Sequence, residues 1–196
     1  MESNPMDREA RKTQIFGELD AESDRGCILV AASALDVLLE DLLRTALVAD
    51  PHAVKHAVAP LFEGMGLLTS FSAKIKLAYG LGLIGKLLFT DLEKIRRIRN
   101  ISAHVYSPMT FESEEIIQVS RTLEAAGLAL LSLPLPDKKS STTAPSDNPK
   151  PHSKSSQERK RFVLTVAYIA GILDGRCETR ESKRRSVKVP SRSDEA

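Results

Sequence analysis

Three polar residues near the middle of the chain, Arg99, Asn100 and His104, have types and a spacing that could do chemistry. Each residue of a helix advances by 100°, so Asn100 and His104 are direct neighbours on its surface, with Arg99 beside them. A guanidinium, an amide and an imidazole could converge there on one anion, which predicts a phosphate site. The competing interpretation is that the three side chains bind helix ends, carboxylates and loop carbonyls of their own fold.

The helix that must position these residues is expected to run from Thr90 or Asp91 to about Val105. Thr90 is the expected N-cap, and the negative charge of Asp91 favours the positive end of the helix dipole. Ile98 and Ile101 lie on the opposite face from the polar residues. The pattern therefore predicts an amphipathic helix with an apolar side for the core and a polar side carrying the motif.

Apolar residues recur at helical spacing along the rest of the chain, and no alternating strand pattern of useful length occurs. Ser23 or Asp24 can cap a first helix that ends near Asp50-Pro51, since proline disfavours helix in the residue before it. The further expected helices are His52 to Phe62, a helix capped by Ser70 or Ser72 and ended by Gly85, and one from Ser113 through Leu130. The predicted fold class is all-α, an antiparallel helical bundle with short turns.

The composition changes sharply after this bundle. From residue 134 to 156 Pro, Ser, Thr, Lys and Asp predominate, which predicts a disordered linker between a bundle domain of residues 1–133 and one more helix. That helix, residues 157–177, is expected to dock on the bundle and to end near Gly175 or Cys177. Residues 178–196 are polar and basic, and the prediction for them is a disordered tail.

The length of 196 residues suits one compact domain with extensions. Residues 1–136 carry 14 Lys and Arg against 18 Asp and Glu, whereas residues 137–196 carry 14 against 8. Because affinity for DNA comes largely from neutralising phosphates, the acidic body argues against direct DNA binding and leaves only the basic tail for it. Cys27 and Cys177 are far apart and are expected to be reduced core thiols.

The polar, acidic N-terminus predicts no secretory signal, and the apolar stretches are too short for a membrane span. We therefore expect a cytoplasmic protein with no membrane partner. His52 and His56 share a helix face but could hold a metal only with ligands from elsewhere, so no metal site and no cofactor is predicted. The sequence also shows no helix-turn-helix, zinc-ligand cysteines or basic zipper that would read DNA.

Three segments together resemble the mannitol operon repressor family of bacterial regulators. They are Glu22 to Gly26, Ser70 to Ile84 and Ile95 to His104, and their order and spacing are also similar. The resemblance covers about residues 16 to 133 and the helix from Phe162 to Leu173. It implies a helical transcriptional regulator that acts through protein contacts, with the Arg99, Asn100 and His104 face as a structural or partner surface.

The same Arg-Asn-x-x-x-His pattern resembles the signature of HEPN domains, small helical bundles many of which are metal-independent ribonucleases. That resemblance implies His104 as the base that takes a proton from a ribose hydroxyl and Arg99 as the group that stabilises the phosphate. Asn100 would hold the imidazole or a phosphate oxygen. Catalysis would require a homodimer that brings two copies of the motif together.

The sequence thus leaves two functions open. The first is a mannitol-repressor-like regulator whose protein partner could itself be a DNA-binding regulator. The second is a dimeric ribonuclease that acts on RNA, as a toxin or defence component, with Arg99, Asn100 and His104 as catalytic residues. Further binding candidates beside the motif are Asp24, Arg25, Lys74 and Arg96. Asp36 and Glu40, four residues apart, could contact the motif or form a solvated surface.

Overall fold

The computed structural model describes residues 17, 19, 21–104, 109–132 and 157–186, with the side chains of 129–132 and 185–186 left aside. These residues form helices and no strand, so the predicted all-α class is confirmed. The elements are α2 (Asp24–Ala46), α3 (Pro51–Ala53), the π-helix η1 (Val54–Val58), α4 (Ala59–Phe62), α5 (Phe71–Gly80), α6 (Lys86–His104), α7 (Glu114–Ser120), α8 (Ala125–Ser132) and α9 (Gln157–Ser186).

The helix α2 is the centre of the bundle and packs against α5, α6 and α9. Ser23 is its N-cap, as predicted, and its hydroxyl oxygen accepts a hydrogen bond from the backbone N–H of Gly26 at 3.1 Å. Leu35, Leu39 and Leu42 are among its fully buried residues. This apolar stripe is the surface on which the other helices assemble.

The α3–η1–α4 segment covers the region expected to be one helix from His52 to Phe62. It contains a π-helical turn, in which the backbone N–H of Ala59 bonds to the carbonyl of Val54. Pro60 follows directly, and a proline ring clashes with the carbonyl four residues earlier in a regular helix. The wider π turn therefore lets the helix continue into the proline.

The helix α6 begins earlier than the sequence predicted. The backbone N–H of Phe89 donates to the carbonyl of Gly85 at 3.0 Å, so the helix starts directly after the turn at Gly85. Thr90 is consequently an interior residue, and its assignment as N-cap is wrong. Asp91 is fully buried rather than exposed at a helix end.

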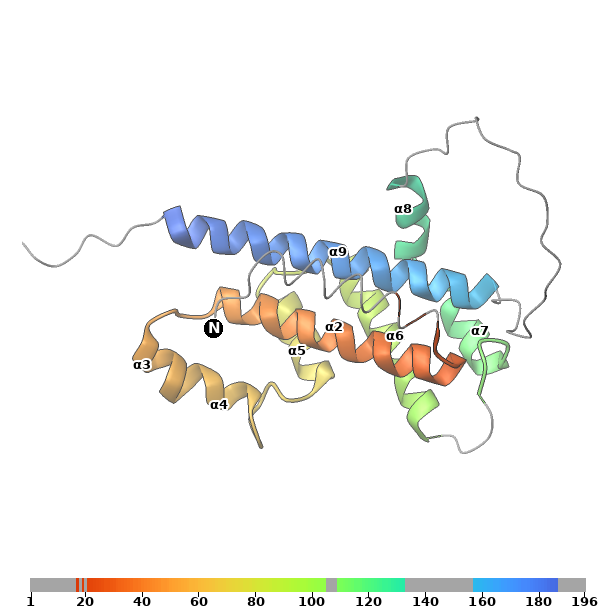
Figure 1. The fold of residues 1–196 in the computed structure, drawn as a ribbon, viewed down its shortest axis with the longest axis horizontal. Helices are drawn as coiled ribbons and strands as arrows, with labels where there is room; N and C mark the ends of the chain where they lie inside the picture. Colours follow the sequence, from red (N-terminus) through yellow and green to blue (C-terminus); the bar gives the residue numbers. More distant parts are fainter. Residues whose placement is uncertain (1–16, 18, 20, 105–108, 133–156, 187–196) are drawn as a thin grey trace, which may run out of the picture.

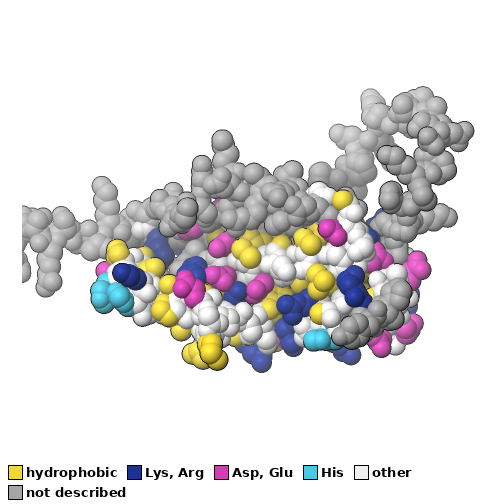
Figure 2. All heavy atoms as spheres, turned by 60° about the horizontal axis from the view of Figure 1, so that its bottom comes forward, with side chains coloured by type: hydrophobic (Ala, Val, Ile, Leu, Met, Phe, Trp, Pro, Cys, Tyr) yellow, Lys and Arg dark blue, Asp and Glu magenta, His cyan; other side chains and the backbone are white. Residues whose placement is uncertain are grey.

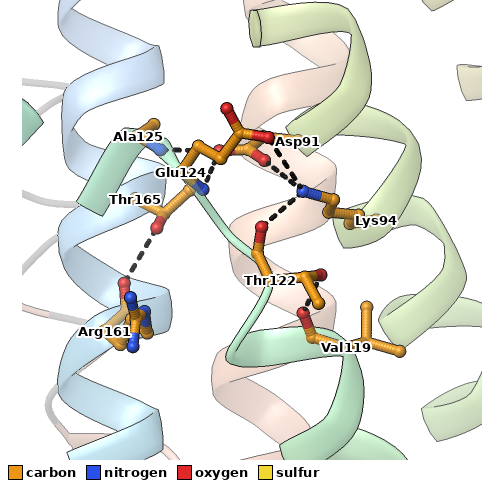
Figure 3. A network of polar contacts seen from close by, with 8 residues as sticks. All are labelled: Asp91, Lys94, Val119, Thr122, Glu124, Ala125, Arg161 and Thr165. Carbon is orange, nitrogen blue, oxygen red and sulfur yellow. Dashed lines mark hydrogen bonds and ion pairs between the residues drawn. The ribbon is translucent and has the colours of Figure 1, made fainter. Parts of the chain in front are cut away.

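Asp91 explains a second difference, the break between α7 and α8 where one helix from Ser113 through Leu130 was predicted (Figure 3). One carboxylate oxygen of Asp91 accepts the backbone N–H groups of Glu124 and Ala125, at 2.9 and 2.8 Å. The other contacts the ammonium of Lys94 at 3.1 Å. A side chain from another helix therefore caps the start of α8, which sequence periodicity alone does not reveal.

The helix α9 lies along α2 in the same direction (Figure 1). Its first turns contact the start of α2 through Arg159 and Asp24, and its last turns contact the end of α2 through Arg184 and Leu47. This pair therefore departs from the antiparallel arrangement expected of the bundle. Phe162, Ile169 and Leu173 of α9 belong to the common core.

The C-terminal end of α9 also corrects the sequence prediction. The helix continues past Gly175 and Cys177 to Ser186, so residues 178–186 are helical rather than part of a disordered tail. Arg176 and Arg184 bind the backbone carbonyls of Leu83 and Leu47, which fixes these turns to the bundle. The predicted linker, 134–156, and the remainder of the predicted tail, 187–196, lie outside the described residues.

Cys27 and Cys177 are both buried thiols and form no disulfide with each other, in agreement with the prediction of reduced core thiols. Within the described part of the chain, no helix is both long enough and apolar enough to cross a membrane.

Candidate functional site

The Arg99, Asn100 and His104 motif lies in the last turns of α6. Leu92, Ile95 and Ile98 of this helix are buried, which directs its other side toward solvent. Arg99 and His104 are exposed and Asn100 is half-buried. The guanidinium of Arg99 donates to the amide oxygen of Asn100 at 3.2 Å. The structure therefore joins two of the three predicted residues by a hydrogen bond.

Arg97 is a further exposed cation of α6, and the sequence reasoning did not single it out. It lies three residues before Asn100 and is therefore its neighbour on the helix surface. We refer to Arg97, Arg99, Asn100 and His104 as the α6 face. Figure 2 shows several Lys and Arg side chains around one histidine on the face drawn, which also carries Asp and Glu side chains. Such an exposed basic surface can attract an anionic partner, with a strength that falls as salt rises.

Arg96 is engaged within its own helix rather than with the motif. Its guanidinium makes two contacts with one carboxylate oxygen of Glu93, at 2.7 and 3.1 Å. A pair at this spacing supports the helix by a few tenths of a kcal/mol, about 0.3. Any partner that Arg96 was predicted to bind would therefore compete with Glu93 of the same helix.

Lys74 of α5 lies in a different cluster, on the side of α2. It is 4% exposed, and its ammonium contacts the carboxylates of Asp36 at 3.1 Å and Glu40 at 2.9 Å. Buried ammonium groups require such partners because removal from water is costly. Asp36 and Glu40 are therefore neither a freely solvated surface nor contacts of Arg99. They join α2 to α5.

Glu40 is held by two cations. Besides Lys74 it accepts hydrogen bonds from Arg44 at 2.8 and 3.0 Å, and the Arg44 guanidinium lies 4.2 Å from the centre of the Phe62 ring. Partial burial by itself raises the pKa of Glu40, but the hydrogen bonds from Lys74 and Arg44 outweigh it, so the pKa is below its ordinary value. Glu40 stays ionised as the centre of a salt-bridge network.

Asp24 and Arg25 lie in the first turn of α2, where both are half-buried. Asp24 does not reach the motif: its carboxylate contacts Arg159 of α9 at 2.5 Å and accepts the backbone N–H of Phe111 at 3.0 Å. Arg159 also donates to the carbonyls of Leu19 and Glu22 at 2.7 and 2.8 Å. These contacts fasten α9 to the start of α2.

Arg159 and Asp91 are therefore important residues that the sequence analysis did not assign. Arg159 is one of several charged residues at the start of α9, and nothing in its spacing indicates a partner 135 positions away. For Asp91 the sequence predicted a carboxylate at the N-terminal end of its own helix. In the structure it caps a different helix, α8. Both act through contacts that only folding creates.

The two histidines His52 and His56 are exposed, and their ring centres are 4.5 Å apart. A protein metal site ordinarily needs three or four such ligands. No group of three or more His, Cys, Asp or Glu side chains able to hold a metal occurs among the described residues.

The matching family model and the matching curated proteins indicate the same family. The family model described as Mannitol repressor matches residues 11–167. The mannitol operon repressors of Escherichia coli K12 and Escherichia coli O6:H1 are each 29% identical to the chain over 118 residues. The aligned region is 60% of this chain and 60% of each repressor, so the chain spans about 60% of the length of these curated relatives.

Two solved structures are also similar. One is described as the X-ray structure of the MtlR-HPr complex from Escherichia coli, with 25% identity and a TM-score of 0.55, covering 87% of this chain and 98% of that one. The other, described as a possible transcriptional regulator YggD from Shigella flexneri 2a, has 18% identity and a TM-score of 0.57, covering 83% and 95%. The second likeness supports the fold alone.

Proposed function

Because this chain belongs to the mannitol repressor family, we propose that it is a cytoplasmic transcriptional regulator that acts through contacts with other proteins. The observation that carries the proposal is the similar Escherichia coli chain described in a complex with HPr, 98% of which is covered by the match. The acidic net charge of residues 1–136 adds support, because affinity for DNA comes largely from cations that neutralise its phosphates.

The proposed direct partner is an HPr-like protein. A separate DNA-binding regulator is proposed to change the transcription of an operon. The α6 face offers a contact surface, because Arg97, Arg99 and His104 are exposed and held on a helix whose other side is buried. Charges on such a surface steer association and set partner choice more than they add affinity.

Calorimetric titration with HPr of the same organism tests this proposal. We expect a complex in which the double variant Arg97→Glu, Arg99→Glu binds at least about tenfold more weakly, while the exposed control Lys55→Glu binds as the wild type does. Equal binding by all three proteins would remove the α6 face from the interface. Absence of a complex, together with unchanged expression of neighbouring operons after gene deletion, would overturn the regulator itself.

The alternative proposal is the dimeric ribonuclease. One observation favours it: Arg99 and His104 are both exposed near the end of α6, where RNA could reach them. The test is incubation of the wild type and His104→Ala with single-stranded RNA in EDTA, with the dimer state measured by sedimentation. Cleavage by the wild type alone would establish the enzyme, and no cleavage by a folded wild type would exclude it.

A further inference from the structure

A groove of about 860 Å³ lies between the end of α2 and the last turns of α9, remote in sequence from the α6 motif. Figure 1 shows these two helix ends at the same end of the molecule, where α3 begins. Arg180, Lys183 and Arg184 of α9 line one side, and Ala46, Leu47 and Ala49 supply apolar surface on the other. Nothing in the proposed function uses this groove.

The charges of the lining are unbalanced. Three cationic side chains and one carboxylate, that of Asp50, line the groove, so the formal charge of the lining residues sums to +2. Asp50 is the N-cap of α3, and its carboxylate accepts the backbone N–H of Ala53 at 2.9 Å. The α9 side of the groove is positioned by the bundle, since the guanidinium of Arg184 donates to the carbonyl of Leu47.

We propose that this groove binds a small organic dianion, a phosphomonoester, whose phosphate contacts the α9 cations and whose body rests on the apolar side. A phosphomonoester carries a charge of about −1.5 to −2 at neutral pH, which matches the net charge of the lining. Guanidinium groups suit phosphate because they donate two parallel hydrogen bonds. The volume is that of small-molecule sites, which span about 300–1,000 Å³.

The site has a structural consequence. A ligand there contacts both the segment that follows α2 and the final turns of α9. Anything that binds only the assembled groove stabilises that assembly by mass action. We therefore expect ligand binding to protect the backbone amides of residues 178–184 from hydrogen exchange, and to leave those of α5 unchanged.

Calorimetry on the full chain with glucose 6-phosphate, glucose and inorganic phosphate tests the proposal. We expect one glucose 6-phosphate per chain, no binding of glucose, and competition by inorganic phosphate. Arg180→Glu should weaken binding at least about tenfold, because it replaces a cation by an opposing charge. Lys160→Glu makes the same charge change at an exposed position in the first turn of α9 and should leave the affinity unchanged.

The absence of glucose 6-phosphate binding at millimolar concentration would overturn the site. Equal weakening by Arg180→Glu and Lys160→Glu would also overturn it, because it would indicate a nonspecific charge effect. Arg180→Gln serves as a second variant if Arg180→Glu alters the circular dichroism spectrum. It removes the charge without reversing it, and retained full affinity in Arg180→Gln would likewise count against the proposal. Neither variant touches the α6 face, so these outcomes are independent of the HPr titration.

Discussion

The α2–α5 and α6–α8 junctions and the α6 face all carry charged side chains but use them differently. At the junctions, Lys74 is 4% exposed and Asp91 is 0% exposed, and each has partners on another element. On the α6 face, Arg97, Arg99 and His104 are exposed. The comparison shows that burial separates the charged side chains that hold this fold together from those available to a partner.

The physical reason is solvation. A buried charge must recover from protein groups what it loses from water, so its partners become part of the structure. An exposed charge keeps its hydration and contributes little to stability. Substitutions at the junctions should therefore change the free energy of unfolding, whereas substitutions on the α6 face should change binding.

The largest expected effect is at Asp91. Asp91→Ala leaves the backbone N–H groups of Glu124 and Ala125 without their acceptor and takes a carboxylate away from Lys94. We expect the free energy of unfolding to fall by about 3 kcal/mol, measured by urea denaturation. The control is Glu124→Ala, which removes a carboxylate 3.8 Å from the same lysine but 63% exposed. A similar loss in both variants would contradict the distinction between buried and exposed charges.

A smaller effect is expected at Glu40, and it depends on pH. The pKa of Glu40 is lower in the folded protein than its ordinary value of 4.5, because its hydrogen bonds to Lys74 and Arg44 outweigh the effect of burial. Its contribution is therefore present above that value and is lost as the pH falls through the folded-state pKa.

Glu40→Gln should lower the free energy of unfolding by about 0.5 kcal/mol at pH 7, since solvent screens this half-buried carboxylate. The difference in free energy of unfolding between the variant and the wild type should disappear as the pH falls below 4.5. Denaturant titrations across this range measure it, with the exposed Glu112→Gln as control. If the difference in free energy of unfolding between the wild type and Glu40→Gln increased at low pH, the predicted direction of the pH dependence would be wrong.

The smallest effect on stability is expected on the α6 face. Arg97→Ala and His104→Ala should change the free energy of unfolding by less than about 0.5 kcal/mol, because surface substitutions away from packed features do little. The same urea titrations provide the measurement. A loss above about 1 kcal/mol in either variant would mean that the face packs within the fold and is not free for a partner.

Much of the fold could be predicted from residues close in sequence. The hydroxyls of Ser23 and Ser70 cap α2 and α5 as their positions before apolar helical runs indicated. The errors came from residues whose partners are distant. Asp91 lies inside α6 and caps the start of α8. The last turns of α9, beyond Gly175, are held by Arg176 and Arg184, which bind the carbonyls of Leu83 and Leu47.

The candidate site divides in the same way. Arg99, Asn100 and His104 lie on one helix, so their proximity followed from spacing, and the three family-like segments agree with the matched family model. Lys74 and Asp24 were placed beside the motif, yet their hydrogen-bond and ion-pair partners are Asp36, Glu40 and Arg159. The spacing of residues around Lys74 and Asp24 does not indicate whether they contact these partners or the motif.

The sequence by itself determined the helical class, the helix caps at Ser23 and Ser70, the family, and the polar side of α6. Helical periodicity and capping are local, so they can be read from a few neighbouring residues. Only the tertiary structure decided which charges are buried, which helix Asp91 caps, and that α9 forms a cationic groove with the end of α2. These features depend on residues far apart in the chain, which meet only when the apolar faces pack.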